Sequence, residues 1–181
     1  MNHLFFTDYF ESISRCVSSV DMYKLEKINS LVENIKINSK KIIIAGNGGS
    51  AAIASHVAVD FSKAANIRSI NFNEADLITC LANDYGYENW ISKALNFYAD
   101  PGDLVFLVSS SGKSPNIING AQTAREMGLG VVTLSGFSRD NPLRELGNIE
   151  LWANSTNYNI VEMTHHIWLL AIVDYIIERQ Y

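Results

Sequence analysis

The chain has 181 residues, of which 48% are hydrophobic, and its formal net charge at pH 7 is −5. This length and apolar content suit a single domain, residues 1–181, with a sizeable buried core. The acidic balance argues against a surface built for nucleic acid or for an anionic membrane.

The first fifteen residues, MNHLFFTDYFESISR, carry acidic side chains and lack the basic start of a signal peptide. The most apolar segment, residues 160–177, is interrupted by Glu162, His165, His166 and Asp174, so we expect no membrane span there. These features predict a soluble cytoplasmic protein.

Apolar residues at helical spacing predict two helices at the start of the chain, over residues 4–18 and 21–37. The β-branched run at 40–46 predicts a buried strand, and a helix with Ser50 as its N-cap follows over 50–63. Residues 77–81 are either a short strand or the start of a helix. The remaining elements, in chain order, are a helix over 88–98, a strand over 103–108, a helix over 115–127, a strand over 130–136, a short helix over 141–146, a strand over 149–153 and a terminal helix over 159–178.

Strands that alternate with helices predict a parallel sheet covered by helices on both faces, which is a three-layer αβα sandwich. In such sheets ligands bind beyond the carboxyl ends of the strands. We therefore expect a ligand site in the loops that follow the strands at 40–46 and 103–108.

Both loops have an unusual composition, GNGGSAA at 46–52 and SSSGKS at 109–114, and each leads into a predicted helix. A helix N-terminus offers unpaired N–H groups and partial positive charge, glycine lets the backbone approach a ligand closely, and small hydroxyls donate hydrogen bonds. The combination predicts a cradle for a phosphoryl group, and the alternative is an ordinary N-cap and tight turn. Neither loop has the pattern of a dinucleotide fingerprint or a P-loop.

Three segments, AGNGGSAAIASHVAVDFSK, CLANDYGYENW and LVSSSGKSPNIINGAQTAREMGLGVVTLSG, resemble the sugar isomerase (SIS) domain family. The resemblance covers roughly residues 42–177, and GNGGSAA followed by His56, together with NDYGYE, resembles the heptose-isomerase branch. It implies a flavodoxin-like fold, a homotetramer with active sites between subunits, to which the helices of residues 1–38 contribute, and a phosphorylated sugar as ligand. It also implies aldose–ketose isomerisation of sedoheptulose 7-phosphate to manno-heptose 7-phosphate, a precursor of surface polysaccharide.

The resemblance implies roles for individual residues. The phosphate-binding serines correspond to Ser109, Ser110, Ser111 and Ser114, the sugar-contacting loop to Asn47, Gly48, Gly49 and Ser50, and an aspartate lining the same site to Asp84.

The catalytic quartet of the heptose isomerases is only partly retained. That quartet acts as acid and base groups and, in some members, as zinc ligands. His56 is kept and the glutamate four residues later becomes Asp60, but Val161 and Leu169 stand where a glutamine and a histidine are expected. A non-catalytic SIS protein that only binds a phosphosugar is therefore an alternative to the enzyme.

His165 lies four residues from each of the two lost positions, on the same helix face. We expect it to approach His56 and Asp60, which are one helical turn apart, and to form either a three-ligand zinc site or a metal-free pair of Asp60 as base and His165 as acid. His166 points about 100° away and is the less favoured partner. The alternatives are a surface carboxylate for Asp60 and a packed side chain for His165.

The predicted terminal helix is apolar on nearly every face, whereas the surface helix of a monomer shows a polar stripe. We expect this helix and the two N-terminal helices to pack against other subunits in a symmetric tetramer.

Overall fold

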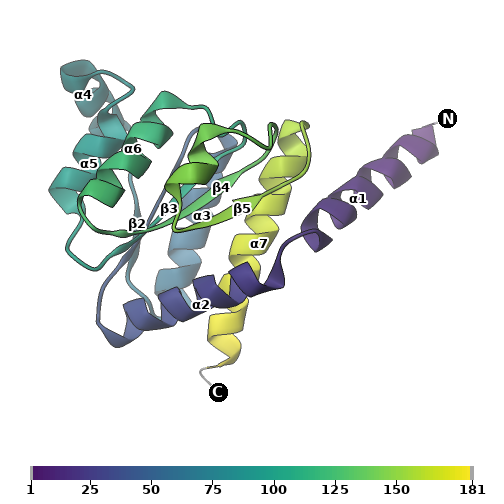
Figure 1. Ribbon diagram of the computed structural model, residues 1–181, viewed down its shortest axis with the longest axis horizontal. Coiled ribbons are helices and arrows are strands. Elements are labelled where there is room, and N and C mark those ends of the chain that lie inside the picture. The colour runs from purple at the N-terminus through teal and green to yellow at the C-terminus, as the bar shows by residue number, and fades with distance from the viewer. Residues whose placement is uncertain (1, 180–181) are drawn as a thin grey trace.

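A computed structural model describes residues 2–179 of the protein. Its centre is a five-stranded sheet in the order β2-β1-β3-β4-β5, and every neighbouring pair of strands is parallel. Helices cover both faces of the sheet (Figure 1), which confirms the predicted three-layer αβα sandwich. The strands are β1 (Ile42–Gly46), β2 (Ser69–Asn71), β3 (Leu104–Ser109), β4 (Gly130–Ser135) and β5 (Ile149–Trp152).

The helices form two layers and one projecting arm. Helices α2, α3 and α7 pack on one face of the sheet, and α5, α6 and the 3₁₀ helix η1 pack on the other, whereas α1 extends away from the body (Figure 1). The bounds are α1 (Asn2–Ser18), α2 (Met22–Ile37), α3 (Gly49–Lys63), α4 (Ala75–Tyr85), α5 (Trp90–Tyr98), α6 (Pro115–Glu126), η1 (Pro142–Leu146) and α7 (Tyr158–Glu178).

The strand β3 shows why the central strands are apolar throughout. Leu104, Phe106 and Val108 join the core on the α2, α3 and α7 side, while Val105 and Leu107 join the core on the α5 and α6 side. Successive side chains of a strand point to opposite faces, so a strand covered on both faces buries every residue.

The structure differs from the predicted elements in three places. Residues 75–85 form one helix, which decides between the two alternatives for 77–81, and β2 is a three-residue strand that the sequence analysis missed. The N-cap of α3 is Gly48 at φ 53°, so the prediction that Ser50 caps this helix is wrong and Ser50 lies buried inside its first turn. A positive φ is a conformation that glycine adopts without strain.

The two unusual loops meet because of the strand order. β2 lies on one side of β1 and β3 on the other, so the order of strands reverses between β1 and β3. In open parallel sheets such a switch point leaves a crevice at the carboxyl ends of the strands. The loops after Gly46 and after Ser109 both open onto this crevice.

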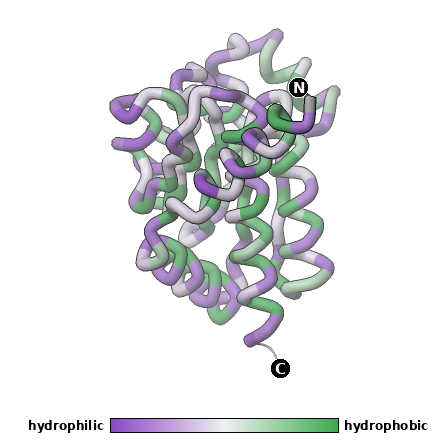
Figure 2. The backbone as a smooth tube through the Cα atoms, turned by 90° about the vertical axis from the view of Figure 1, so that its right-hand side faces the viewer, coloured by the Kyte–Doolittle hydropathy of each residue, from purple (hydrophilic) through white to green (hydrophobic). Residues whose placement is uncertain are grey.

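Helix α7 is long and apolar enough, by length and composition alone, to cross a membrane. The core helix of a globular fold passes the same test, and about half of this apolar stretch is buried inside the structure. Val161, Trp168 and Leu169 are among its buried side chains. Figure 2 shows this helix, which ends at the C-terminus, running beside the rest of the structure with mostly hydrophobic residues. This burial supports α7 as a core helix.

Candidate functional site

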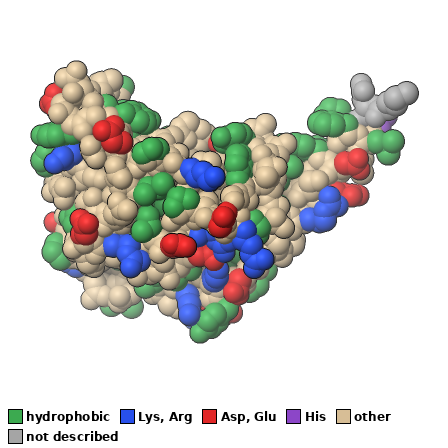
Figure 3. All heavy atoms as spheres, turned by 45° about the horizontal axis from the view of Figure 1, so that its top comes forward, with side chains coloured by type: hydrophobic (Ala, Val, Ile, Leu, Met, Phe, Trp, Pro, Cys, Tyr) green, Lys and Arg blue, Asp and Glu red, His purple; other side chains and the backbone are tan. Residues whose placement is uncertain are grey.

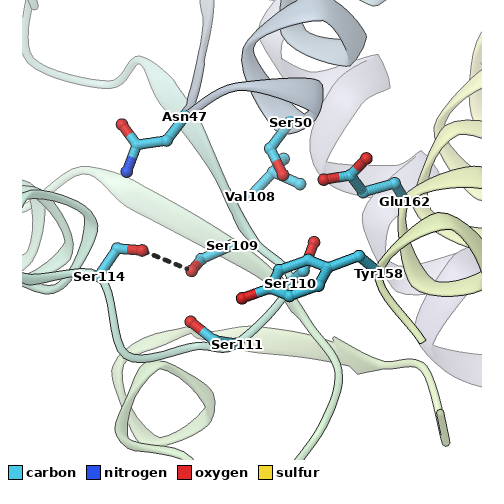
Figure 4. Close-up of a pocket in the computed structure, with 9 residues that line it drawn as sticks. All are labelled: Asn47, Ser50, Val108, Ser109, Ser110, Ser111, Ser114, Tyr158 and Glu162. Atoms are coloured by element: carbon cyan, nitrogen blue, oxygen red, sulfur yellow. Dashed lines mark hydrogen bonds between the residues drawn. The ribbon is translucent and has the colours of Figure 1, made fainter. Parts of the chain in front are cut away.

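A cavity of about 100 Å³ lies at the switch point between β1 and β3 (Figure 4). The two unusual loops contribute most of its wall, and the start of α7 closes the opposite side. The lining residues are Asn47, Ser50, Val108, Ser109, Ser110, Ser111, Ser114, Tyr158 and Glu162.

The loop after β3 turns its hydroxyls toward this cavity. The Oγ atoms of Ser109 and Ser114 are 3.2 Å apart, and Ser111 Oγ accepts a hydrogen bond from the N–H of Lys113 at 3.2 Å. The hydroxyl of Ser110 is buried and has no hydrogen-bond partner within residues 2–179. A buried hydroxyl without a partner is costly, so a ligand oxygen at this place would remove the cost.

Two helices begin at the cavity, and α6 starts with Pro115, which has no N–H, so the first backbone donor of α6 is that of Asn116. The N-caps are Gly48 for α3 and Ser114 for α6, and neither helix has a side-chain capping hydrogen bond. The first four N–H groups of a helix need partners from outside the helix, and the helix dipole places partial positive charge there. An anion between the two helix ends would supply those partners.

Glu162 supplies a carboxylate to the cavity wall and was not among the predicted site residues. Its carboxylate lies against Gly49, where a Cβ atom would overlap it, so the glycine allows α7 to approach α3 closely. The preceding residue, Val161, is fully buried and packs against Gly136. The only sequence signal was spacing, because Glu162 and His166 are four residues apart and share one face of the helix.

A row of three ionisable side chains continues along the contact between α3 and α7. His56 Nδ1 lies 2.9 Å from His166 Nε2, and His56 Nε2 lies 3.2 Å from a carboxylate oxygen of Asp60. In the contact between the two imidazoles one ring donates a hydrogen bond and the other accepts it, and the Asp60 carboxylate lies beside the other ring nitrogen of His56. The side chain of His56 is 51% exposed, so small molecules reach the row from solvent.

Burial lowers the pKa of His166 from its ordinary value; the neighbouring His56 lowers it further, and Asp60 partly opposes both. A lowered pKa favours the neutral imidazole. Neutral His166 has one unprotonated ring nitrogen that is able to accept a proton.

Residues 8–136 of the chain match the family described as the SIS domain. The chain belongs to this family. A phosphoheptose isomerase of Fusobacterium nucleatum is 35% identical over 133 residues, which are 70% of this chain and 69% of the relative.

Solved structures share the SIS fold of this chain. A phosphoheptose isomerase from Francisella tularensis has a TM-score of 0.88 at 22% identity and covers 98% of this chain and 99% of its own. The Vibrio vulnificus NanR protein complexed with ManNAc-6P has a TM-score of 0.71 at 21% identity and covers 94% of this chain and 59% of its own.

The SIS fold brings together the predicted site residues of the two loops, whereas the histidine predicted on α7 lies elsewhere. Asn47 and Ser50 lie at the cavity with the four serines of the second loop, whereas Gly48 and Gly49 shape the start of α3. Asp84 is exposed on α4, where its carboxylate accepts a hydrogen bond from Asn83 at 2.9 Å. Asp84 is not among the residues that line this cavity, and its role in the site stays a prediction.

The expected trio of His56, Asp60 and His165 is wrong. The side chain of His165 is 0% exposed and its Nε2 lies 2.9 Å from the carbonyl oxygen of Ser135. It therefore faces the sheet, and a fully buried side chain is out of reach of a neighbouring subunit as well. His166 occupies the place that was predicted for His165, because the helix turns the next residue toward α3.

The structure also tests whether these side chains fit zinc. Within residues 2–179 no group of three His, Cys, Asp or Glu side chains converges on one point. The two ring nitrogens of His56 face His166 on one side and Asp60 on the other, so the three side chains form a row and not a cage. As arranged, they do not fit a tetrahedral zinc ion.

Proposed function

We propose that this SIS-domain protein is a phosphosugar aldose–ketose isomerase that converts sedoheptulose 7-phosphate to a manno-heptose 7-phosphate. The observation that carries the proposal is a hydroxyl-lined cavity at two helix N-termini, with the row of His166, His56 and Asp60 further along the same two helices, α3 and α7. The first part suits a phosphate and the second suits proton transfer.

The phosphate binds at the serine end of the cavity. Ser110, Ser111 and Ser114 supply hydroxyl donors, and the first turns of α3 and α6 supply backbone N–H donors. Hydrogen bonds to a charged acceptor are about twice as strong as those between neutral groups. The cavity thus holds a dianion without needing a basic residue among those that line it.

Glu162 fixes the direction in which the sugar lies. Two negative charges in a small cavity repel each other, so the phosphate sits at the serines and away from this carboxylate. The sugar hydroxyls then donate to Glu162, and the chain of the sugar runs along α3 and α7. From Gly49 to His56 is seven residues, which is about 10 Å along a helix.

Proton transfer takes place at the histidine pair. In an aldose–ketose isomerisation a base removes a proton from the carbon beside the carbonyl and the proton returns to the neighbouring carbon. Neutral His166 accepts this proton and returns it to the neighbouring carbon, while His56 gives a proton to the carbonyl oxygen and takes one back from the adjacent hydroxyl. Asp60, whose carboxylate lies 3.2 Å from Nε2 of His56, orients that imidazole, and this role replaces the role of base first predicted for it.

Zinc at this row stays a prediction from the resemblance alone. The side chains do not converge on a metal position, so the proposed steps pass only through the residues of the chain.

An isomerase assay on the purified protein tests this proposal. Purified protein is incubated with sedoheptulose 7-phosphate, and the aldose product is followed by chromatography. We expect turnover in the unmodified protein and none in a His56→Ala, His166→Ala double variant that still binds the substrate. Absence of turnover in the unmodified protein, with substrate binding present, would overturn the isomerase.

A non-catalytic phosphosugar-binding protein is the second candidate, and one observation favours it. Val161 and Leu169, which stand where the resemblance places a glutamine and a histidine, are both fully buried in the core. These positions therefore supply no polar group to a site in this chain. The binding cavity is complete without them, so the same assay separates binding from turnover.

We also propose that the protein is a cytoplasmic homotetramer that supplies precursors of surface polysaccharide. Helix α1 projects from the body and carries exposed hydrophobic side chains (Figure 3), among them Phe5 and Phe10 at 64% exposure each. On α7, Met163 and Ile167 are also exposed. Burial of such side chains between copies of the chain is favourable. A monomer by light scattering at micromolar concentration would contradict the tetramer.

A further inference from the structure

We propose that the side chain of Asn47 serves only as a hydrogen-bond donor to the ligand, and that Asn116 and Tyr87 hold it in that orientation. The nature of the ligand, a phosphorylated sugar, rests on the proposed function. The orientation of the amide rests on the hydrogen bonds around it.

Asn47 and Asn116 form a reciprocal pair of hydrogen bonds. Asn47 Nδ2 donates to Asn116 Oδ1 at 3.0 Å, and Asn116 Nδ2 donates to Asn47 Oδ1 at 2.8 Å. Asn116 is 1% exposed and stands in the first turn of α6. Two bonds between planar amides fix both the position and the plane of the Asn47 side chain.

Tyr87 decides which atom of Asn47 stays free. Its hydroxyl donates to Asn47 Oδ1 at 3.1 Å, in addition to the bond from Asn116. A carboxamide oxygen accepts two hydrogen bonds and the NH₂ group donates two. The oxygen of Asn47 is therefore fully used, whereas one N–H remains available.

The free N–H faces the ligand. Figure 4 shows the nitrogen of Asn47 on the side of the cavity, toward Ser109 and Ser114, and the oxygen on the far side. An N–H at this place meets an oxygen of a phosphoryl group or the ester oxygen beside it. The oxygen of Asn47 is not available to a sugar hydroxyl. Glu162, on the opposite wall of the cavity, is the acceptor for the sugar hydroxyls.

The arrangement also ties the two halves of the site together. Asn47 belongs to the loop after β1, and Asn116 belongs to the helix that follows the serine loop after β3. Tyr87 comes from the segment between α4 and α5. Asn116 and Tyr87 are thus positioning residues, because they act on the ligand through Asn47.

The first test changes the hydrogen-bonding group of Asn47: Asn47→Ala removes it, and Asn47→Asp replaces it with an anion of about the same size. Binding of inorganic phosphate and of sedoheptulose 7-phosphate is measured by calorimetry. Asn47→Ala loses one hydrogen bond to a charged group, so affinity should fall roughly tenfold. Asn47→Asp replaces the donor with an anion, so affinity should fall by roughly a hundredfold or more. Equal binding by Asn47→Asp and the unmodified protein would overturn the inference.

The second test removes the support of Asn47. Tyr87→Phe deletes a single hydroxyl from an exposed side chain, so the fold is preserved. Its KM should rise roughly fivefold while kcat changes less than about twofold, since one hydrogen bond is lost. The matched control is Tyr85→Phe at the end of α4, two residues away, which should leave both constants unchanged. A merely structural role would lower the melting temperature of Tyr87→Phe and leave its KM unaltered, and that result would also overturn the inference.

The two proposals fail in different ways. A protein that binds the sugar phosphate through Asn47 and turns nothing over contradicts the isomerase but supports the donor role. A protein with turnover whose Asn47→Asp and Tyr87→Phe variants match the unmodified enzyme contradicts only the donor role. If neither phosphate nor the sugar phosphate binds the unmodified protein, both proposals are wrong.

Discussion

The two ends of the site are built from different chemical groups. At the ends of β1 and β3 the donors are serine hydroxyls, an amide side chain and backbone N–H groups, most of which do not change charge with pH. Along the contact of α3 and α7 the groups are His166, His56 and Asp60, which do.

This difference separates what each end is able to do. Neutral donors fixed by loops and helix ends bind an anion with little rearrangement. Ionisable side chains on helices give and take protons, and their behaviour depends on the neighbours they face. Changes at the serine end should therefore alter binding, and changes at the histidine end should alter turnover.

The largest effect is expected at the histidine end. His56→Ala removes the centre of the row, so kcat should fall by roughly a hundredfold to ten-thousandfold, the usual contribution of acid–base catalysis. The affinity for inorganic phosphate should stay the same, because His56 does not line the cavity. Steady-state kinetics and calorimetry measure the two quantities. A parallel loss of phosphate affinity would contradict the division of labour between the two ends.

The second prediction concerns stability and a histidine outside both ends. Burial lowers the pKa of His165 from 6.5 to about 4, and the hydrogen bond to Ser135 only partly opposes this. Between pH 6.5 and pH 4 the unfolded chain binds a proton that the folded chain does not, so the free energy of unfolding should fall by roughly 3 kcal/mol as the pH drops. Below this range the contribution levels off.

Urea unfolding at several pH values measures this contribution. His165→Gln removes the titrating group, so the difference in unfolding free energy between this variant and the unmodified protein should change with pH across this window. His3→Gln on the exposed helix α1 is the matched control. If the difference in unfolding free energy between His165→Gln and the unmodified protein does not change with pH, the pH dependence does not come from the lowered pKa of His165.

The third prediction concerns the contribution of individual hydroxyls to binding at the serine end. Ser111→Ala and Ser114→Ala should each weaken binding of sedoheptulose 7-phosphate by about 1.5–3 kcal/mol, because each removes a hydrogen bond to a charged oxygen. Their kcat should change much less than their affinity. Calorimetry on the single variants and on the double variant checks the values. Retained affinity in the double variant would rule out the phosphate cradle.

The smallest effect is expected where the two ends meet. Glu162→Gln removes the negative charge from the cavity wall but keeps a hydrogen-bonding group. Inorganic phosphate should bind several-fold more tightly, because removing the charge of Glu162 relieves about 1 kcal/mol of repulsion between this carboxylate and the phosphate in a solvated site. The KM for the sugar phosphate should not fall with it, because sugar hydroxyls lose their carboxylate acceptor. Weaker binding of phosphate by this variant would contradict the proposed direction of the sugar.

The sequence predicted the serine end well because its residues are contiguous. Ser109 to Ser114 form one short loop, and the rule that parallel sheets bind ligands at the carboxyl ends of their strands is enough to locate it from the sequence. The same reasoning placed Asn47 and Ser50 beside it. It could not supply Asn116, which reaches the site only because α6 packs next to the loop after β1.

The histidine end was predicted less well because its residues lie on two helices far apart in sequence. The expected face of α7 was derived from Val161 and Leu169, but both are buried in the core and the face beside α3 is one residue further on. Advancing by one residue turns a helix by about 100°, so a choice between His165 and His166 is a choice between the sheet and the site.

The sequence by itself determined the alternation of strands and helices, the two loops that line the cavity and the helix that carries His56 and Asp60. These follow from local patterns, namely apolar runs, glycines at tight turns and small polar residues before a helix. Only the tertiary structure decided which side of α7 faces α3, and therefore that Glu162 and His166 belong to the site and His165 to the core. The physical reason is that α7 is apolar around most of its circumference, so periodicity alone gave no direction, and packing against the sheet set its rotation.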